Sequence, residues 1–143
     1  MNRRKFTPTE RAYIEQRAKG CCEYCQTMLD YSPETFQIEH IFPFSQGGTN
    51  ELFNLALSCG GCNRRKRNRT TAIDFLTGEA VLLFNPRLDL WRSHFNWSAD
   101  FSKIEGKTPV GRATIDALAL NRTGLINLRK ALAAFGVHPP TVD

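Results

Sequence analysis

The sequence lacks any long hydrophobic run. Its longest strictly apolar stretches, such as residues 80–84, are far shorter than the roughly 18 residues that a membrane-spanning helix needs. The N-terminal segment is basic, but no apolar stretch follows it, so nothing indicates a secretory signal peptide. We therefore expect a cytoplasmic protein. In a reducing compartment, paired cysteines favour metal binding over disulfide formation.

Internal repeats and low-complexity linkers are also missing. The 143 residues suffice for one domain with its own core, and 41% hydrophobic with 23% charged residues is typical of a globular protein. We expect an α+β fold in a single domain with three parts. These are an N-terminal helix in residues 1–21, a central core in residues 22–70 and a mainly helical C-terminal extension in residues 71–143, packed on the core.

Acidic and basic residues are segregated along the chain. Residues 1–20 carry six basic and two acidic side chains, residues 21–62 carry five acidic and no basic ones, and residues 63–69 carry five basic ones. An acidic middle between basic flanks suits a metal-dependent enzyme acting on a polyanion, because carboxylates hold a cation while Lys and Arg hold phosphate. The alternative is a solvated basic helix face.

Helix signals stand near both ends of the chain. Thr7 and Glu10 have the spacing of a capping box, and Pro8 suits the first turn of the helix that follows. Apolar residues follow helical spacing over residues 110–118 and again over residues 125–135. The sequence therefore predicts one helix before the central segment and two helices in the extension.

The central segment shows the pattern of strands. Residues 36–42 alternate between apolar and polar, and residues 52–57 form a second short apolar segment, which together predict a hairpin with a long connection. The basic run from Cys62 suits an exposed helix. Residues 81–84 favour a strand or a buried strut, and residues 91–104 favour a hairpin that turns near Ala99 and Asp100.

Four of the five cysteines form two pairs. Cys22 and Cys25 are separated by two residues, as are Cys59 and Cys62, and this spacing lets paired thiolates reach one tetrahedral ion. Because 33 residues lie between the pairs, a substructure must be looped out between them, and the expected hairpin fills that place. We predict a structural zinc ion held by these four thiolates.

Other interpretations of the cysteines remain. Cys59 and Cys62 could form a thioredoxin-like redox pair, which would make the chain a disulfide-exchange protein, although the βαβ context of that motif is not evident. The four could also be unpaired buried residues. Cys21 fits the knuckle spacing less well, and we expect it only to pack. Four thiolates around Zn²⁺ leave a net charge of about −2, which Arg64 and Lys66 would help to offset.

Several motifs around the cysteines match one known pattern together and in order. The stretch reads Cys22-Glu-Tyr-Cys25, Ile38-Glu-His-Ile41, Pro43, Gly47-Gly48, Asn54-Leu55 and Cys59-Gly-Gly-Cys-Asn-Arg-Arg-Lys66. It resembles the His-Asn-His (HNH) endonuclease family, in the variant with Asn at the third position. The resemblance covers residues 22–66, about a third of the chain. It implies a ββα-metal fold, in which two strands and a helix hold one divalent cation.

The resemblance also implies roles for individual residues. His40 would be the general base that takes a proton from the attacking water. Glu39 and Asn63 would present oxygens to a catalytic Mg²⁺, or Mn²⁺, at the scissile phosphate. Asn54 would orient His40 or brace the loop. The purely structural alternatives are an ion-paired His40, a turn role for Asn54 and a helix-cap role for Asn63.

The basic run is interpreted as the nucleic-acid contact. The phosphate-binding side chains would be Arg64, Arg65, Lys66, Arg67 and Arg69, with DNA as the expected substrate and a monomer or weak homodimer as the expected state. We expect His94, His138, Trp91 and Trp97 to be structural. The rival hypothesis is a non-catalytic zinc-ribbon module that binds nucleic acid or a protein, since only Glu39, His40 and the two asparagines separate it from a nuclease.

Overall fold

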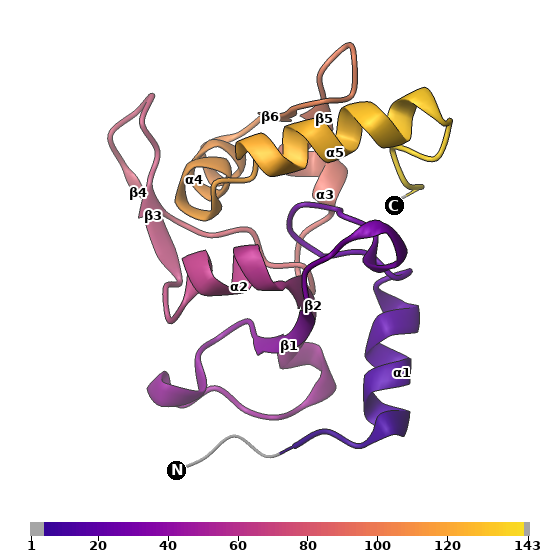
Figure 1. Ribbon diagram of the computed structural model, residues 1–143. Helices are drawn as coiled ribbons and strands as arrows, with labels where there is room; N and C mark the ends of the chain where they lie inside the picture. Colours follow the sequence, from indigo (N-terminus) through magenta and orange to yellow (C-terminus); the bar gives the residue numbers. More distant parts are fainter. Residues whose placement is uncertain (1–4, 142–143) are drawn as a thin grey trace.

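Short helices alternate with two-stranded hairpins along the chain (Figure 1). The computed structural model describes residues 5–141; residues 1–4 of the expected N-terminal part and residues 142–143 lie outside it. The helices are α1 (Pro8–Arg17), α2 (Gly60–Lys66), α3 (Trp91–His94), α4 (Pro109–Leu118) and α5 (Thr123–Ala134). The strands are β1 (Phe36–His40), β2 (Leu55–Cys59), β3 (Thr71–Ile73), β4 (Ala80–Leu82), β5 (Phe95–Trp97) and β6 (Ile104–Gly106). The α+β prediction is confirmed.

The N-terminal helix begins where the capping box predicts. The Thr7 hydroxyl accepts the Glu10 amide at 3.1 Å, and the Glu10 carboxylate accepts the Thr7 amide at 2.9 Å. The helix buries Ile14 completely. From its last turn, Arg17 donates to the backbone carbonyl of Leu55 at 2.6 Å. These contacts hold α1 beside the central hairpin.

The central hairpin and the helix after it form a ββα unit. β1 and β2 are antiparallel, with Phe36 opposite Cys59 and His40 opposite Leu55. The helix α2 follows β2 directly and lies between this hairpin and α4. The second strand begins later than predicted, because residues 52–54 form a 3₁₀ turn and the strand runs over Leu55–Cys59.

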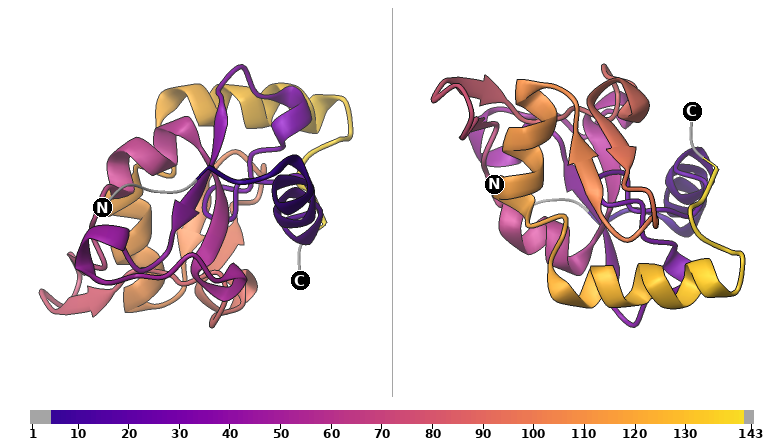
Figure 2. Two further views of the ribbon diagram at one scale, coloured as in Figure 1. Left: turned by 90° about the horizontal axis from the view of Figure 1, so that it is seen from below. Right: turned by 90° about the horizontal axis from the view of Figure 1, so that it is seen from above.

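The C-terminal extension contains two hairpins besides its helices, so "mainly helical" describes it incompletely. A hairpin with its turn near Asp100 is present, as predicted, but it begins only at Phe95, because residues 91–94 form α3. The hairpin β3–β4 was only half predicted, because three-residue strands carry too little periodicity to be recognised. In Figure 1, α4 and α5 lie above the central hairpin, and in both views of Figure 2 the C-terminal end of α5 lies on the same side as α1.

One hydrophobic core joins all three parts of the chain. It contains Ile14 from α1, Tyr24 from the cysteine knuckle, Leu57 from β2, and Phe84 and Leu118 from the extension. A core shared in this way cannot be divided without exposing apolar surface on both sides. No helix among residues 5–141 has the length and apolar character required to cross a bilayer.

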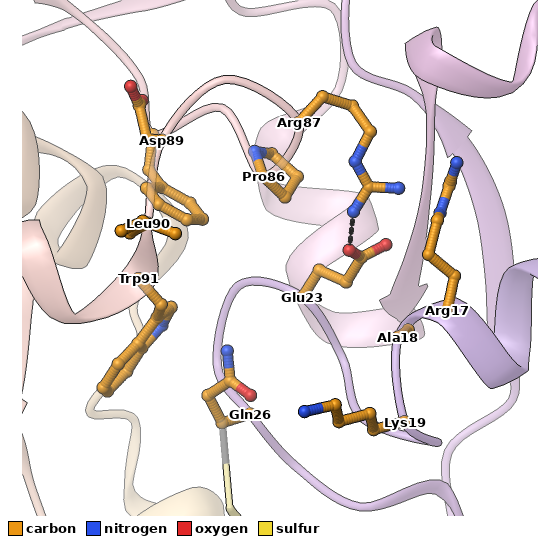
Figure 3. A pocket seen from close by; sticks show the side chains of 11 residues that line it. Arg17, Ala18, Lys19, Glu23, Gln26, Pro86, Arg87, Asp89, Leu90 and Trp91 are labelled. Atoms are coloured by element: carbon orange, nitrogen blue, oxygen red, sulfur yellow. Dashed lines mark hydrogen bonds and ion pairs between the residues drawn. The ribbon is translucent and has the colours of Figure 1, made fainter. Parts of the chain in front are cut away.

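A polar pocket of about 160 Å³ marks one seam between the extension and the rest (Figure 3). Glu23 forms an ion pair with Arg87, and the two side chains are only 10% and 13% exposed. Arg87 also donates to the carbonyl of Leu55, which accepts a second hydrogen bond from Arg17. Burial, with the neighbouring Arg17, lowers the pKa of Arg87 to about 10, so it stays charged at pH 7. The pocket contains none of the predicted site residues.

Candidate active site and metal centre

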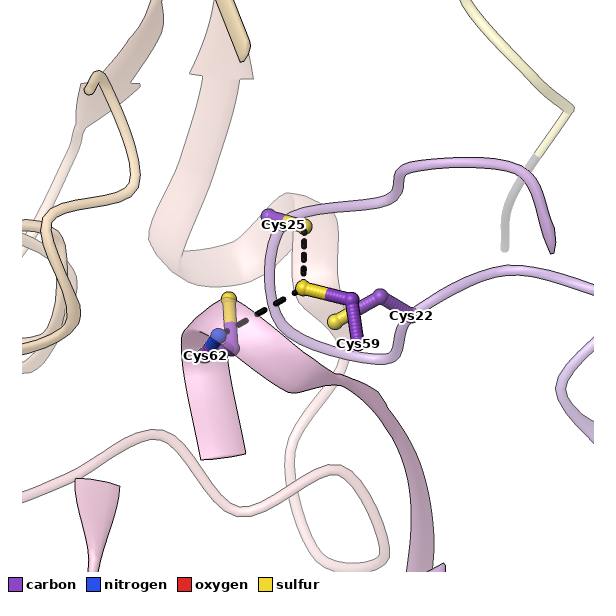
Figure 4. A group of neighbouring side chains, drawn as sticks. All are labelled: Cys22, Cys25, Cys59 and Cys62. Atoms are coloured by element: carbon purple, nitrogen blue, oxygen red, sulfur yellow. Dashed lines mark hydrogen bonds between the residues drawn. The ribbon is translucent and has the colours of Figure 1, made fainter. Parts of the chain in front are cut away.

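The four paired cysteines converge in the interior (Figure 4). Their sulfur atoms all lie within 4.8 Å of one another, and all four residues are buried. Cys22 and Cys25 come from the knuckle after α1, Cys59 ends β2, and Cys62 lies in the first turn of α2. Four convergent thiols are the donor set of a structural tetrahedral zinc site, and the cluster suits Zn²⁺.

Local hydrogen bonds shape this cluster. The Cys59 sulfur caps α2 by accepting the amide of Cys62 at 3.5 Å, and Thr27 contacts the Cys25 sulfur at 3.0 Å. Cys21 stays outside the cluster, where its thiol contacts the Lys19 carbonyl. Burial raises the pKa of the Cys21 thiol to about 11, which keeps it protonated and suits a packing role.

The cation next to the sulfurs is not one of those predicted. Arg122, from the extension, places Nη2 at 3.4 Å from the Cys59 sulfur and Nη1 at 3.7 Å from the Cys62 sulfur. Arg64 instead points to solvent, 71% exposed and 3.6 Å from Glu34. Lys66 is buried against another partner. The prediction that Arg64 and Lys66 offset the thiolate charge is therefore wrong.

His40, the candidate general base, is only 2% exposed. Its Nε2 lies 2.8 Å from the side-chain oxygen of Asn50, and the rings of Phe44 and Phe6 lie at 5.3 and 6.4 Å. Because an amide oxygen can only accept, Nε2 carries the proton in this pair. The other ring nitrogen, Nδ1, is buried with no hydrogen-bond partner among the described residues. When the imidazole is neutral, this arrangement leaves an unshared lone pair on Nδ1.

Glu39, the candidate cation ligand, is held inside the molecule. Its Oε2 lies 3.1 Å from Lys66 Nζ, both side chains being 3% exposed, and its Oε1 accepts a hydrogen bond from the Tyr24 hydroxyl. Burial, then the charge of Glu39, raises the pKa of Tyr24, which keeps that hydroxyl a donor. Lys66 also donates to the Ile41 carbonyl at 2.9 Å. The structure thus turns Lys66 inward, contrary to the expected phosphate contact.

Asn63 lies on the same helix face as Lys66 but meets a different partner. It donates to the side-chain oxygen of Gln37. Gln37 and Glu39 share one face of β1, while Asn63 and Lys66 stand on successive turns of α2. Carboxylate and amide oxygens are the donors that Mg²⁺ and Mn²⁺ prefer, so the chemistry fits a hard cation. In this structure Glu39 and Asn63 have separate partners, Glu39 with Lys66 and Tyr24 and Asn63 with Gln37.

Asn54 braces the loop between the two strands. Its side chain accepts the Phe42 amide at 2.9 Å and donates to the carbonyls of Phe42 and Thr49 at 3.1 and 2.9 Å. No hydrogen bond within residues 5–141 links it to His40. Gly48 lets the loop close, because a Cβ there would stand 1.9 Å from the Phe42 carbonyl oxygen. Of the two expected roles for Asn54, the structure displays the bracing one.

The remaining basic residues of the run stay on the surface. Arg64, Arg65, Arg67 and Arg69 are all exposed, and Arg69 donates to the Ala117 carbonyl at 2.9 Å. They follow α2 and the turn after it, so their charges lie on one segment beside the central hairpin. The structure separates this exposed group from the buried Lys66.

The aromatic and histidine residues expected to be structural have partners within the fold. Trp91 donates to the Tyr24 carbonyl, and Arg129 lies 5.2 Å from the ring centre of Trp97. His94 bonds the Thr108 hydroxyl, and His138 bonds the Phe101 carbonyl.

Three residues near the site escaped prediction: Tyr24, Asn50 and Arg122. Tyr24 stands inside the cysteine knuckle, where an aromatic between two ligands is a weak signal of a site. Asn50 is one of several polar residues in a glycine-containing loop. Arg122 lies 60 residues beyond Cys62 in the chain, so no spacing pattern could connect them.

One comparison with known proteins gives a match. Residues 22–69 match the family model described as HNH endonuclease. Neither the curated proteins nor the solved structures yielded a match to the chain. The matched range contains the four clustered cysteines, both ends of the central hairpin and all of α2, and it excludes the extension.

Proposed function

We propose that this chain, whose residues 22–69 match the HNH endonuclease family, hydrolyses phosphodiester bonds in DNA with His40 as the general base. The family match supports nuclease activity, and the four buried cysteines suit a structural Zn²⁺ in its frame. The proposal adds the substrate, the base and one divalent cation at the scissile phosphate.

The observation that carries the proposal is the state of the His40 ring. Asn50 occupies Nε2 and leaves Nδ1 without a partner, which is the tautomer a base needs to accept a proton from water. A histidine with a purely structural role would be expected to satisfy both nitrogens once buried. In the proposed reaction, Nδ1 takes the proton of the attacking water, and Asn50 holds the ring in that orientation.

Glu39 and Asn63 would hold the divalent cation. When bound, such a cation neutralises charge that develops on the phosphate and the leaving oxygen. Tyr24 fixes one oxygen of Glu39. Lys66 ties the last turn of α2 to the carboxylate and to the Ile41 carbonyl, and so positions α2, which carries Asn63, relative to Glu39 on β1. Small displacements of such groups can cost about 100-fold in rate.

The exposed arginines would bind the phosphate backbone. Arg64, Arg65, Arg67 and Arg69 offer four positive charges that need no rearrangement to meet a polyanion. One site per chain makes single-strand nicking the expected reaction, whether the chain acts as a monomer or a weak homodimer. Because His40 is 2% exposed, substrate reaches Nδ1 only after the side chains around the ring move.

A plasmid-nicking assay tests the reaction. Wild-type protein with Mg²⁺ should convert supercoiled DNA to the nicked form, and EDTA should stop it. His40→Ala should lose more than about 100-fold of the rate. His94→Ala, which removes a histidine bonded within the extension, is the matched control and should keep cutting. Equal cutting by the His40→Ala protein would refute the assigned base.

The burial of Glu39 and His40 favours one alternative, a non-catalytic nucleic-acid-binding module. In that case Glu39 and Lys66 serve only as an internal ion pair. The module predicts that labelled duplex DNA binds equally to wild type and His40→Ala, while neither protein cuts DNA with Mg²⁺ or Mn²⁺. Replacing Arg64, Arg65 and Arg67 with Gln should weaken binding under either hypothesis, and the salt dependence of binding should fall.

A further inference from the structure

Arg122 joins the C-terminal extension to the cysteine cluster. It stands at the start of α5, outside the matched residues 22–69, and its side chain is 16% exposed. One arm of its guanidinium points to the Cys59 sulfur at 3.4 Å and the other to the Cys62 sulfur at 3.7 Å. Arg122 Nη1 also donates to the Ala119 carbonyl at 3.2 Å, so a backbone group of the extension helps to orient the guanidinium.

Gly61, between Cys59 and Cys62, leaves space for the Arg122 guanidinium. A Cβ on Gly61 would stand 2.4 Å from Arg122 Nη2 and 2.8 Å from a carboxylate oxygen of Glu34. Both atoms are the ends of flexible side chains, and they fill the space that glycine leaves open. Glu34 Oε2 lies 3.6 Å from Arg122 Nη2. Because position 61 has no side chain, the guanidinium approaches the sulfurs without displacing a neighbour.

The chemistry of the cluster explains what a guanidinium does there. Four thiolates around Zn²⁺ carry a net charge of about −2, and burial makes that charge costly. N–H groups that donate to ligand sulfur disperse the charge and fix the ligand orientation. Arg122 is suited to both, because its planar fork donates to two sulfurs at once and cannot lose its proton.

We propose that Arg122 is a positioning residue of the metal centre, which retains the zinc by holding the Cys59 and Cys62 thiolates and thereby couples the extension to the HNH domain. This inference rests on the structural zinc of the proposed function. It assigns to the extension a role in metal retention rather than in substrate contact.

The experiment measures zinc retention. Wild type, R122Q, R122K and R64Q are purified without added metal, their zinc content is determined, and zinc release to a chromophoric chelator is timed. R64Q is the matched control, because Arg64 also lies 3.6 Å from Glu34 and has no sulfur contact among the described residues. We expect R122Q to release zinc at least about 10-fold faster than wild type, and R64Q to match wild type.

Each outcome decides the proposal. Wild type without zinc would overturn the metal site itself, whereas zinc-loaded wild type with an unchanged R122Q release rate would overturn only the role of Arg122. If R122Q does not fold, R122K decides, since it keeps the charge but loses the two-pronged geometry. We expect its release to be faster than wild type, and a wild-type rate would refute the proposal. Nicking activity is not needed for any of these measurements.

Discussion

Lys66 and Glu39 form an ion pair that is almost entirely removed from water. Their side chains are each 3% exposed, and the ammonium has a second partner in the Ile41 carbonyl. Burying two charges contributes little net stability, because desolvation offsets their attraction. Removing one partner is different, since the remaining charge stays buried without its counter-charge. The lysine that the sequence marks as a phosphate contact is therefore a structural element of the site.

Replacing Lys66 with Met should consequently lower the free energy of unfolding by about 3–5 kcal/mol. Met preserves the length and packing of the side chain and removes only its charge. The measurement is urea denaturation followed by circular dichroism. Arg67→Met is the control, because Arg67 is exposed, and it should change the free energy by less than about 0.5 kcal/mol. A Lys66→Met protein as stable as the control would contradict the ion pair.

At the level of elements, one carboxylate fastens the β3–β4 hairpin to α4. Asp74 is completely buried, and Arg112 donates to both of its oxygens, at 2.9 and 3.0 Å. The Thr77 hydroxyl adds a third hydrogen bond at 2.8 Å. The Arg112 guanidinium holds the pKa of Asp74 well below its usual range.

A depressed carboxyl pKa gives stability that is present above the unfolded-state pKa of about 3.9 and is lost as the pH falls below it. Asp74→Asn should therefore lower the melting temperature at pH 6, and its deficit relative to wild type should shrink as the pH falls from about 5 to 2. Acid also releases zinc, but it does so in both proteins, so their difference reports Asp74. Asp116→Asn, at an exposed position of α4, is the control. A deficit that is constant with pH would contradict the assignment.

At the level of the whole molecule, the cysteine cluster links the central core to the extension. The knuckle, the end of β2 and the start of α2 supply its sulfurs, and Arg122 brings in the extension. The hydrophobic core also includes the N-terminal helix, through Ile14, and so joins all three parts. We expect residues 1–21, 22–70 and 71–143 to be parts of one folding unit.

Removing zinc with a strong chelator should then abolish the fold in a single step. Hydrogen exchange should show the amides of β2 and α4 losing protection together, because folding free energy in such sites is tied to metal binding. Adding Zn²⁺ should restore protection, and adding Mg²⁺ alone should not. If α4 kept its protection while β2 lost it, the extension would be an independent domain.

The features that could be predicted lie close together in the chain. The capping box of Thr7 and Glu10 spans three residues, the alternation of β1 spans five, and each cysteine pair spans a single turn. Each of these patterns depends only on the local backbone conformation, so it can be recognised without knowing the tertiary structure. The candidate residues Glu39, His40, Asn54 and Asn63 were implied by a family resemblance, which the match of residues 22–69 to the HNH family supports.

The sequence by itself determined where the longer helices and the central hairpin lie and that the four cysteines belong together, and through a family resemblance it indicated which side chains are candidates for acid–base and metal chemistry. The tertiary structure alone decided their partners. It turned Lys66 inward to Glu39, paired Asn63 with Gln37, left His40 Nδ1 bare and brought Arg122 to the sulfurs. These pairings join residues 26 to 63 positions apart. They depend on burial and on how helices and strands pack, which no short stretch of sequence encodes.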